Sequence, residues 1–248
     1  MPRPARKQAV ANRAVSRRFF AIVLPVLLLF GLAALGFHYL SQPGRMPLRV
    51  IEVTGEFTYL DQAAIEERVA KAIRGGFLDV DLQRIRAQVL DMPWVDQVSI
   101  RRVWPDTLKM HVTEQVPLAY WNEDALVNFD GRVFRPKSLP DLGKLPHLYA
   151  RDAAAREVVA FYLQLHAQLL SQALRIDTVR LNRRNEWKVG FRNGLKLILG
   201  REDIAQRQQA FLYVYPKLLA HMRRQPERID MRYAHGFAVR WRETAGDS

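Results

Sequence analysis

The chain has 248 residues, of which 49% are apolar and 25% charged, and its formal net charge is +13. These proportions are ordinary for a globular protein and exclude a disordered chain. The sequence contains no cysteine, which excludes a disulfide scaffold, a thiol nucleophile and a thiolate metal site.

The first notable element is the apolar stretch Phe19–Leu40, which has no acidic or basic side chain. At about 1.5 Å per residue, a helix of this length matches the ~30 Å hydrocarbon core of a bilayer, so we expect a single transmembrane helix. The basic tail 1–18 ends with Arg13, Arg17 and Arg18, and cationic flanks stay in the cytoplasm. These residues therefore predict the topology, with 41–248 on the far side of the membrane.

Two alternatives exist for this N-terminus. A cleavable signal peptide has a shorter apolar region and a small-x-small site, for which the chain offers only Ala34-Leu35-Gly36. The stretch Ser16–Phe20 resembles a twin-arginine export signal, which would carry a folded cargo. The length of the apolar stretch favours an uncleaved anchor, and two arginines can simply end the basic tail.

A linker over 41–47 contains two prolines, and the pattern after it predicts a compact unit over 48–116. Apolar residues recur at helical spacing after two aspartates that can each cap a helix, and alternate at strand spacing elsewhere. The expected elements are a strand at Val50–Val53, helices after Asp61 and Asp81, and strands at Val98–Ile100 and Leu108–Val112. The order is β-α-α-β-β.

Residues 117–242 predict a second domain, mostly antiparallel β with flanking helices, before a polar tail at 243–248. Asn193-Gly194 is the strongest hairpin signal, because both residues tolerate positive φ. Helices are expected at Asp152–Gln172 and after Asp203, with an irregular connection around Pro136–Pro146. The expected strands are Leu118–Trp121, Ala125–Asn128, Arg132–Phe134, Ile176–Leu181, Trp187–Phe191, Leu195–Leu199, Ile229–Tyr233 and Phe237–Trp241. The fold class is α+β.

The sequence offers no catalytic constellation. Its histidines have no metal-binding spacing, and the serine-nucleophile and phosphate-loop motifs are absent. We therefore expect no enzyme activity, cofactor, metal or small-molecule substrate, although a site assembled from distant residues is the alternative. Outside the first 40 residues the basic side chains are scattered singly or in pairs, which favours a solvated or membrane-facing surface over a nucleic-acid interface.

An interaction protein is the remaining class, and the final strand, Phe237–Trp241, is the place to look. Phe237, Val239 and Trp241 alternate with Ala238 and Arg240. A last strand often lies at a sheet edge, where unpaired backbone groups can recruit a strand from a partner. The pattern alone leaves open whether this edge is open or paired.

Several local stretches together follow one known pattern: Val50–Gly55, Pro93–Val95, Trp104–Leu108, Glu114–Ala119, Leu197–Arg201, Asp230–Tyr233 and Gly236–Val239. With these stretches, residues 19–242 resemble the FtsQ/DivIB family of bacterial cell division proteins. The first part alone would fit any POTRA domain, including those of other assembly factors.

The resemblance implies a POTRA domain and a non-catalytic divisome scaffold in the bacterial inner membrane. The bulk would be periplasmic, at the division septum. It implies binding to FtsB and FtsL, an influence on septal peptidoglycan synthesis, and further divisome contacts through the POTRA domain. The family adds a strand from FtsB at the end of the second domain, although Phe237 is bulkier than the small residue that relatives often hold there. The partner-binding residues implied by position are Arg232, Tyr233, His235, Gly236, Phe237, Ala238 and Trp241.

Overall fold

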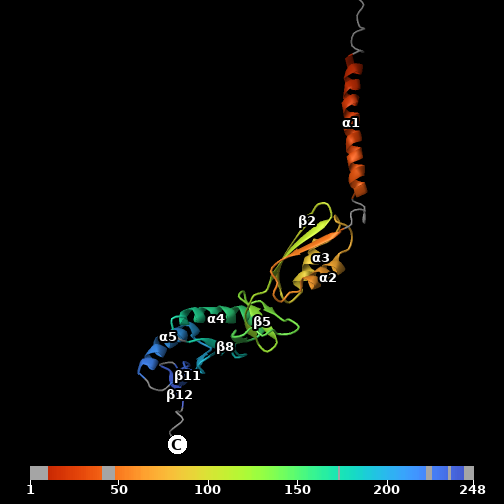
Figure 1. The fold of residues 1–248 in the computed structure, drawn as a ribbon. Coiled ribbons are helices and arrows are strands. Elements are labelled where there is room, and N and C mark those ends of the chain that lie inside the picture. Colours follow the sequence, from red (N-terminus) through yellow and green to blue (C-terminus); the bar gives the residue numbers. More distant parts are fainter. Residues whose placement is uncertain (1–10, 41–47, 173, 222–224, 234–235, 243–248) are drawn as a thin grey trace, which may run out of the picture. The chain divides into compact units, whose positions relative to one another are not determined.

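The computed structural model describes residues 11–40, 48–172, 174–221, 225–233 and 236–242 (Figure 1). Two compact units can be distinguished, Met1–Thr113 and Glu114–Ser248. The partner-binding prediction at His235 lies outside the described residues, as do the tail 243–248 and the linker 41–47.

Helix α1 (Ala11–Leu40) contains the apolar stretch predicted at 19–40. Its described large apolar side chains between Leu24 and Leu35 are 55–76% exposed. In the part of the chain that the structure describes, no helix combines the length and the apolar character that crossing a membrane requires. Arg13, Arg17 and Arg18 belong to α1, but their side chains lie outside the described part, so the predicted topology stays a prediction.

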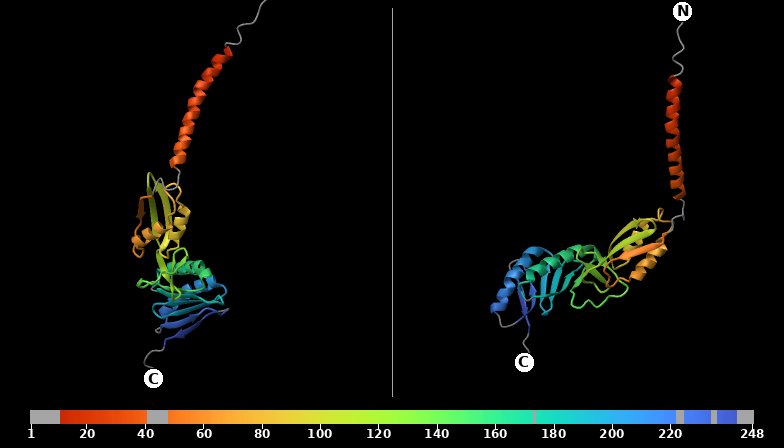
Figure 2. Two further views of the ribbon diagram at one scale, coloured as in Figure 1. Left: turned by 90° about the vertical axis from the view of Figure 1, so that its right-hand side faces the viewer. Right: turned by 45° about the horizontal axis from the view of Figure 1, so that its top comes forward.

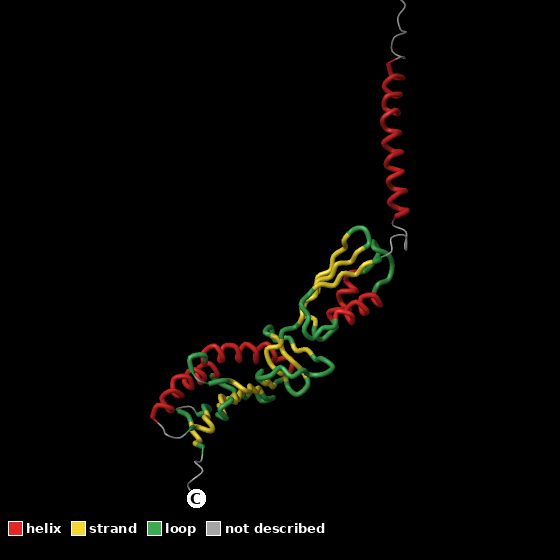
Figure 3. Tube along the Cα trace, in the orientation of Figure 1, coloured by secondary structure: helices red, strands yellow, loops and turns green. Residues whose placement is uncertain are grey.

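The first unit contains the predicted β-α-α-β-β order. Both predicted caps are present: the carboxylate of Asp61 accepts the N–H of Ala63, and that of Asp81 accepts the N–H groups of Gln83 and Arg84. The strands lie in the order β1-β3-β2, with β1 parallel to β3 (Figure 3). The elements are β1 (Val50–Thr54), α2 (Gln62–Ala72), α3 (Leu82–Leu90), β2 (Val95–Val103) and β3 (Thr107–Glu114).

The two helices and the sheet of this unit share one core. Ile65 and Val69 of α2 and Ile85 and Val89 of α3 are completely buried, at the i, i+4 spacing that the sequence shows. Met110 of β3 is buried in the same cluster. Burying one stripe of each helix against one face of a small sheet is what holds the unit together.

The second unit is built on a sheet of nine described strands in the order β12-β11-β10-β9-β8-β7-β4-β5-β6. Five of its pairings are antiparallel, as predicted for most of the domain. Three are parallel: β10 with β11, β4 with β7, and β7 with β8. The strands are β4 (Pro117–Trp121), β5 (Ala125–Asn128), β6 (Val133–Phe134), β7 (His147–Tyr149), β8 (Ile176–Leu181), β9 (Trp187–Phe191), β10 (Lys196–Gly200), β11 (Pro226–Asp230) and β12 (Ala238–Trp241).

Strand β7 begins directly after the predicted irregular connection Pro136–Pro146, at a position where no strand was expected. It has only three residues, and it exists because it fits between β4 and β8 with parallel register on both sides. Ring stacking reinforces it, since the centroids of Tyr120 and His147 are 4.8 Å apart. Such a strand depends on partners far away in sequence, so local alternation could not reveal it.

Helices α4 (Ala155–Leu169) and α5 (Ile204–His221) cover one face of the nine-stranded sheet (Figure 2). The first three residues of the predicted helix, Asp152–Ala154, form the 3₁₀ turn η1. Leu165 of α4 and Phe211 of α5 are completely buried against the inward side chains of the strands. The opposite face of β8–β11 carries exposed polar side chains.

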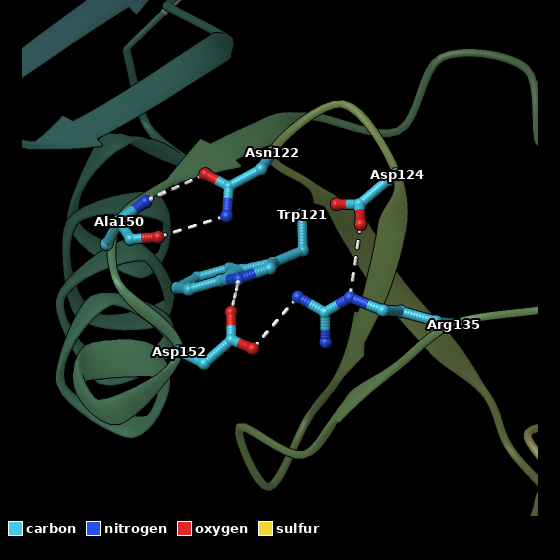
Figure 4. Close-up of polar contacts among 6 residues, drawn as sticks. All are labelled: Trp121, Asn122, Asp124, Arg135, Ala150 and Asp152. Carbon is cyan, nitrogen blue, oxygen red and sulfur yellow. Dashed lines mark hydrogen bonds and ion pairs between the residues drawn. The ribbon is translucent and has the colours of Figure 1, made fainter.

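A polar network ties the β4–β5 hairpin to the start of α4 (Figure 4). The indole N–H of the fully buried Trp121 donates to Asp152 Oδ1 at 2.8 Å. The guanidinium of Arg135 donates both to Asp152, at 2.9 Å, and to Asp124, at 3.2 Å. The amide of Asn122 both donates to and accepts from the backbone of Ala150. The bond from Trp121, followed by that from Arg135, holds the pKa of the Asp152 carboxyl below its usual value despite partial burial.

Candidate partner-binding edge of the sheet

Strand β12 lies at one end of the nine-stranded sheet. It pairs antiparallel with β11, and among the described residues no strand pairs with its outer side. Ala238 and Arg240 are exposed, whereas Val239 and Trp241 are half-buried, and Val239 packs against the core cluster that includes Phe211 of α5. The last predicted strand is therefore an edge strand.

The backbone of β12 presents a defined set of groups to the open edge. The N–H of Arg242 donates to the carbonyl of Gln225 at 3.0 Å, so this group points toward the side of β11. Successive N–H groups of a strand point in opposite directions, which places those of Ala238 and Arg240 on the β11 side as well. The N–H and C=O groups of Val239 and Trp241 consequently face the open edge.

Two arginine side chains at the C-terminal end of β12 hold the strand against the sheet. Arg240 Nε lies 3.3 Å from a carboxylate oxygen of Glu227 on β11. Arg242 Nη2 donates to the carbonyl of Asn193, in the β9–β10 turn, at 2.9 Å. The edge is thus fixed in place before any partner arrives, which lowers the entropic cost of pairing with it.

The chain turns after β11 at Asp230, three residues earlier than the strand predicted to end at Tyr233. The Asp230 carboxylate accepts the backbone N–H of Arg232 at 3.1 Å and binds its guanidinium at 2.7–3.1 Å. This local bonding competes with continued strand pairing and ends β11. Burial raises the pKa of the Asp230 carboxyl, but the bonds from Arg232 outweigh it, and the pKa is lowered overall.

The other predicted partner-binding residues that the structure describes are Tyr233, which follows this turn, and Gly236, Phe237, Ala238 and Trp241, which lie in or next to β12. Tyr233 is 61% exposed and Phe237 37% exposed. A Cβ built on Gly236 would meet no atom within 4 Å, so the backbone there is open to approach. The turn and the strand thus combine exposed aromatic side chains with accessible backbone.

A groove next to this edge lies on the open face of the sheet and has a volume of about 590 Å³. Gly190 occupies its floor, because it pairs with Thr178 on one side and Lys196 on the other. Five basic side chains line the groove: Arg180, Lys188, Lys196, Arg228 and Arg232. These basic residues are far apart in the sequence, and they lie close together because of the register of strands β8 to β11.

Among the described residues, no group of three or more histidine or acidic side chains is arranged to hold a metal ion. The pKa of Tyr162 and that of Tyr215 are raised by burial, and both side chains belong to the core between the sheet and the helices. These tyrosines are packing residues.

The architecture is that of a POTRA-type unit followed by a mixed-sheet domain with β12 at one edge. Comparison with protein families agrees: residues 46–115 match the POTRA domain, FtsQ-type, and residues 119–232 match the C-terminal part of the cell division protein FtsQ/DivIB. Residues beyond 232, including Tyr233 and Trp241, lie outside the matched segment.

Curated relatives named cell division protein FtsQ are similar over most of the chain. The protein from Thioalkalivibrio sp. (strain K90mix) is 38% identical over 81% of this chain and 83% of its own length. That from Allochromatium vinosum is 34% identical over 88% of both chains. That from Escherichia coli (strain K12) is 33% identical over 90% of this chain and 82% of its own. The chain therefore belongs to the FtsQ/DivIB family of cell division proteins, as its sequence motifs predicted.

Proposed function

We propose that this chain is a non-catalytic scaffold of the division machinery that captures a strand of FtsB at β12. The observation that carries the proposal is the open edge, where Val239 and Trp241 direct backbone N–H and C=O groups away from β11. Edge-strand addition uses such groups for affinity and neighbouring side chains for specificity. FtsL would join through FtsB, and the complex would influence septal peptidoglycan synthesis.

The side chains around the edge suit a partner with both apolar and acidic residues. Tyr233, which is 61% exposed, and the half-buried Trp241 offer aromatic surface of the kind that dominates interface energetics. Arg232 is held in one orientation by the largely buried Asp230, so its half-exposed guanidinium is positioned for a partner carboxylate. His235, Gly236, Phe237 and Ala238 complete the proposed contact region.

We further propose that 19–40 anchors the chain in the inner membrane, with 1–18 in the cytoplasm and the two compact domains in the periplasm. Support comes from the apolar side chains between Leu24 and Leu35, which are exposed on α1 and have no described protein partner that covers them. Anchoring in the same membrane as FtsB and FtsL would raise the effective concentration of the β12 edge for its partner. The POTRA-type unit would contact other division proteins.

The binding proposal is tested by measuring the affinity of the full-length protein for a soluble FtsB segment. Tyr233→Ala and Trp241→Ala should each weaken binding about 30-fold, as expected for aromatic hot-spot residues. Tyr213→Ala is the matched control, because Tyr213 is 67% exposed but lies on α5. Unchanged affinity in both edge variants would refute the site.

The topology proposal is tested by reporter fusions at residues 18 and 45. A cytoplasmic signal at 18 and a periplasmic signal at 45 are expected, because the basic residues Arg13, Arg17 and Arg18 favour the cytoplasmic side. A periplasmic signal at residue 18 would overturn the orientation.

A further inference from the structure

The first unit carries an exposed apolar cluster at one end, formed by Leu78, Val103 and Trp104 and called the tip below. Leu78 and Val103 are each 38% exposed, and Trp104 is 66% exposed. Leu78 lies in the loop before α3, whereas Val103 ends β2 and Trp104 begins the turn to β3. Exposed tryptophan next to exposed aliphatic side chains is unusual on a protein surface without a partner.

The tip is held in a fixed arrangement. The ring of Trp104 packs edge-on against the buried Phe77, with centroids 5.7 Å apart. The guanidinium of Arg102 donates to the carbonyls of Phe77 at 2.9 Å, Leu78 at 3.4 Å and Val80 at 2.6 Å, which joins the loop to the end of β2. The apolar surface is therefore presented by rigid structure, and ordering it on binding has little further cost.

The tip lies at the end of the unit where the chain arrives from α1. The carbonyl of Asp106, in the same turn as Trp104, accepts the N–H groups of Arg49 at 3.0 Å and Val50 at 3.4 Å. The chain between Leu40 and Leu48 can span at most about 30 Å when fully extended. The tip thus cannot be far from the C-terminal end of α1, whatever path the linker takes.

The basic side chains around the tip suit an anionic surface. Arg49, Arg101 and Arg102 are exposed there, against the exposed Asp79 and the half-buried Asp106, while the carboxylate of the exposed Asp81 caps α3. Tryptophan is enriched where the hydrocarbon core meets the headgroups, and each basic side chain near an anionic leaflet adds attraction. An aromatic and aliphatic cluster with basic neighbours is therefore more stable in the headgroup region of an anionic bilayer than in water.

We propose that the tip inserts into the interfacial layer of an anionic bilayer. Trp104, Val103 and Leu78 would then hold the β-α-α-β-β part of the first unit, residues 48–113, against the membrane that carries α1. The inference rests on the proposed anchoring of 19–40. Its consequence is a second attachment point, which would restrict rotation of the unit about its linker. A lipid surface is favoured over a protein partner because the linker keeps the tip close to the anchor and because the exposed set includes tryptophan with basic neighbours.

The absence of cysteine allows a direct test with single labelling sites. Val103→Cys, labelled with the environment-sensitive dye NBD, is placed in the full-length protein in nanodiscs that contain phosphatidylglycerol. Glu56→Cys is the matched control, because Glu56 is exposed just beyond the opposite end of β1. Lipids with a doxyl group near the headgroup should quench the dye at 103 at least twofold more than at 56.

Further variants and lipids separate the outcomes. Trp104→Ala should reduce the quenching at 103 without changing incorporation into nanodiscs, and pure phosphatidylcholine should weaken it. Equal quenching at 103 and 56 in incorporated protein would overturn this inference and leave the anchor intact. Failure of the full-length protein to enter nanodiscs would overturn the anchor and this inference together. Quenching at 103 only after addition of FtsB would indicate a protein-dependent placement and would also overturn it.

Discussion

The two edges of the nine-stranded sheet are built in opposite ways. At one edge all four residues of β5 are buried, the last strand β6 has only two residues, and Trp121 is bonded to Asp152 beneath the hairpin. At the other edge β12 has four residues, of which none is fully buried, and its outward backbone groups are accessible. A very short edge strand discourages pairing, whereas a longer and open one permits it. Under the proposed function, one edge of the sheet contributes stability and the other edge contributes recognition.

The largest expected effect comes from removing the buried side chain of Trp121, at the end of β4 near the β6 edge. Trp121→Ala should lower the free energy of unfolding by about 3–5 kcal/mol, because a completely buried indole and its bond to Asp152 are lost. Urea unfolding of the full-length protein in detergent, followed by far-UV circular dichroism, measures it. Trp241→Ala at the β12 edge should cost only about 1–2 kcal/mol, because this indole is half-buried. Similar losses for the two variants would contradict the proposed division between the edges.

Proline substitutions in β12 sharpen the comparison further. Val239→Pro removes an outward N–H and should weaken FtsB binding about 30-fold or more, while the free energy of unfolding changes by less than about 1 kcal/mol, because edges tolerate proline. Arg240→Pro removes an N–H on the β11 side and should destabilise the fold by about 1–3 kcal/mol. Calorimetric binding together with thermal unfolding distinguishes them, and normal binding by Val239→Pro would argue against strand addition.

Acid should destabilise the part of the sheet near the β6 edge by protonating Asp152, which is bonded to Trp121 and Arg135. Its pKa is lowered in the folded protein, so its stabilising contribution is present above the unfolded value of about 3.9 and is lost as pH falls through the folded pKa. Asp152→Asn should cost about 1 kcal/mol at pH 7, since the carboxylate is half-exposed and screened, and should flatten the fall in melting temperature below about pH 4. The control is Asp130→Asn, at an exposed acid of the β5–β6 turn. An unchanged acid profile for Asp152→Asn would show that the network does not titrate as proposed.

The smallest effect is expected at the rim of the open edge. Arg240→Ala breaks the ion pair with Glu227, but the Arg240 side chain is 63% exposed, so the free energy of unfolding should change by less than about 0.5 kcal/mol. High salt should remove even this difference in a thermal unfolding assay. A larger, salt-independent loss would mean that β12 depends on this pair.

Local patterns in the sequence were sufficient for elements that depend on near neighbours. The spacing of Ile65 and Val69 predicts α2, and Asn193-Gly194 predicts the β9–β10 hairpin, which the structure contains. The expected last strand, Phe237–Trp241, agrees with β12 to within one residue. These features follow from side-chain periodicity and backbone conformation, which a single sequence records.

What the sequence could not supply depends on distant pairing. β7 is stabilised by β4 and β8, and the parallel pairing of β10 with β11 connects segments separated by α5. The basic groove around Gly190 likewise arises from register, because Lys196 and Arg228 are neighbours only across two strands. The roles of Tyr233 and Trp241 in binding remain predictions, to be decided by the affinity measurements above.

The position of β12 in the sheet has a consequence for biosynthesis. Among the described strands, β12 pairs only with β11, and β11 connects it to the rest of the sheet through parallel pairing with β10 across α5. A chain that has been synthesised only as far as α5 would present β10 as its edge, with different side chains and a different direction. The capture surface for FtsB would therefore form last, so that competence to join the division complex would report a completed domain.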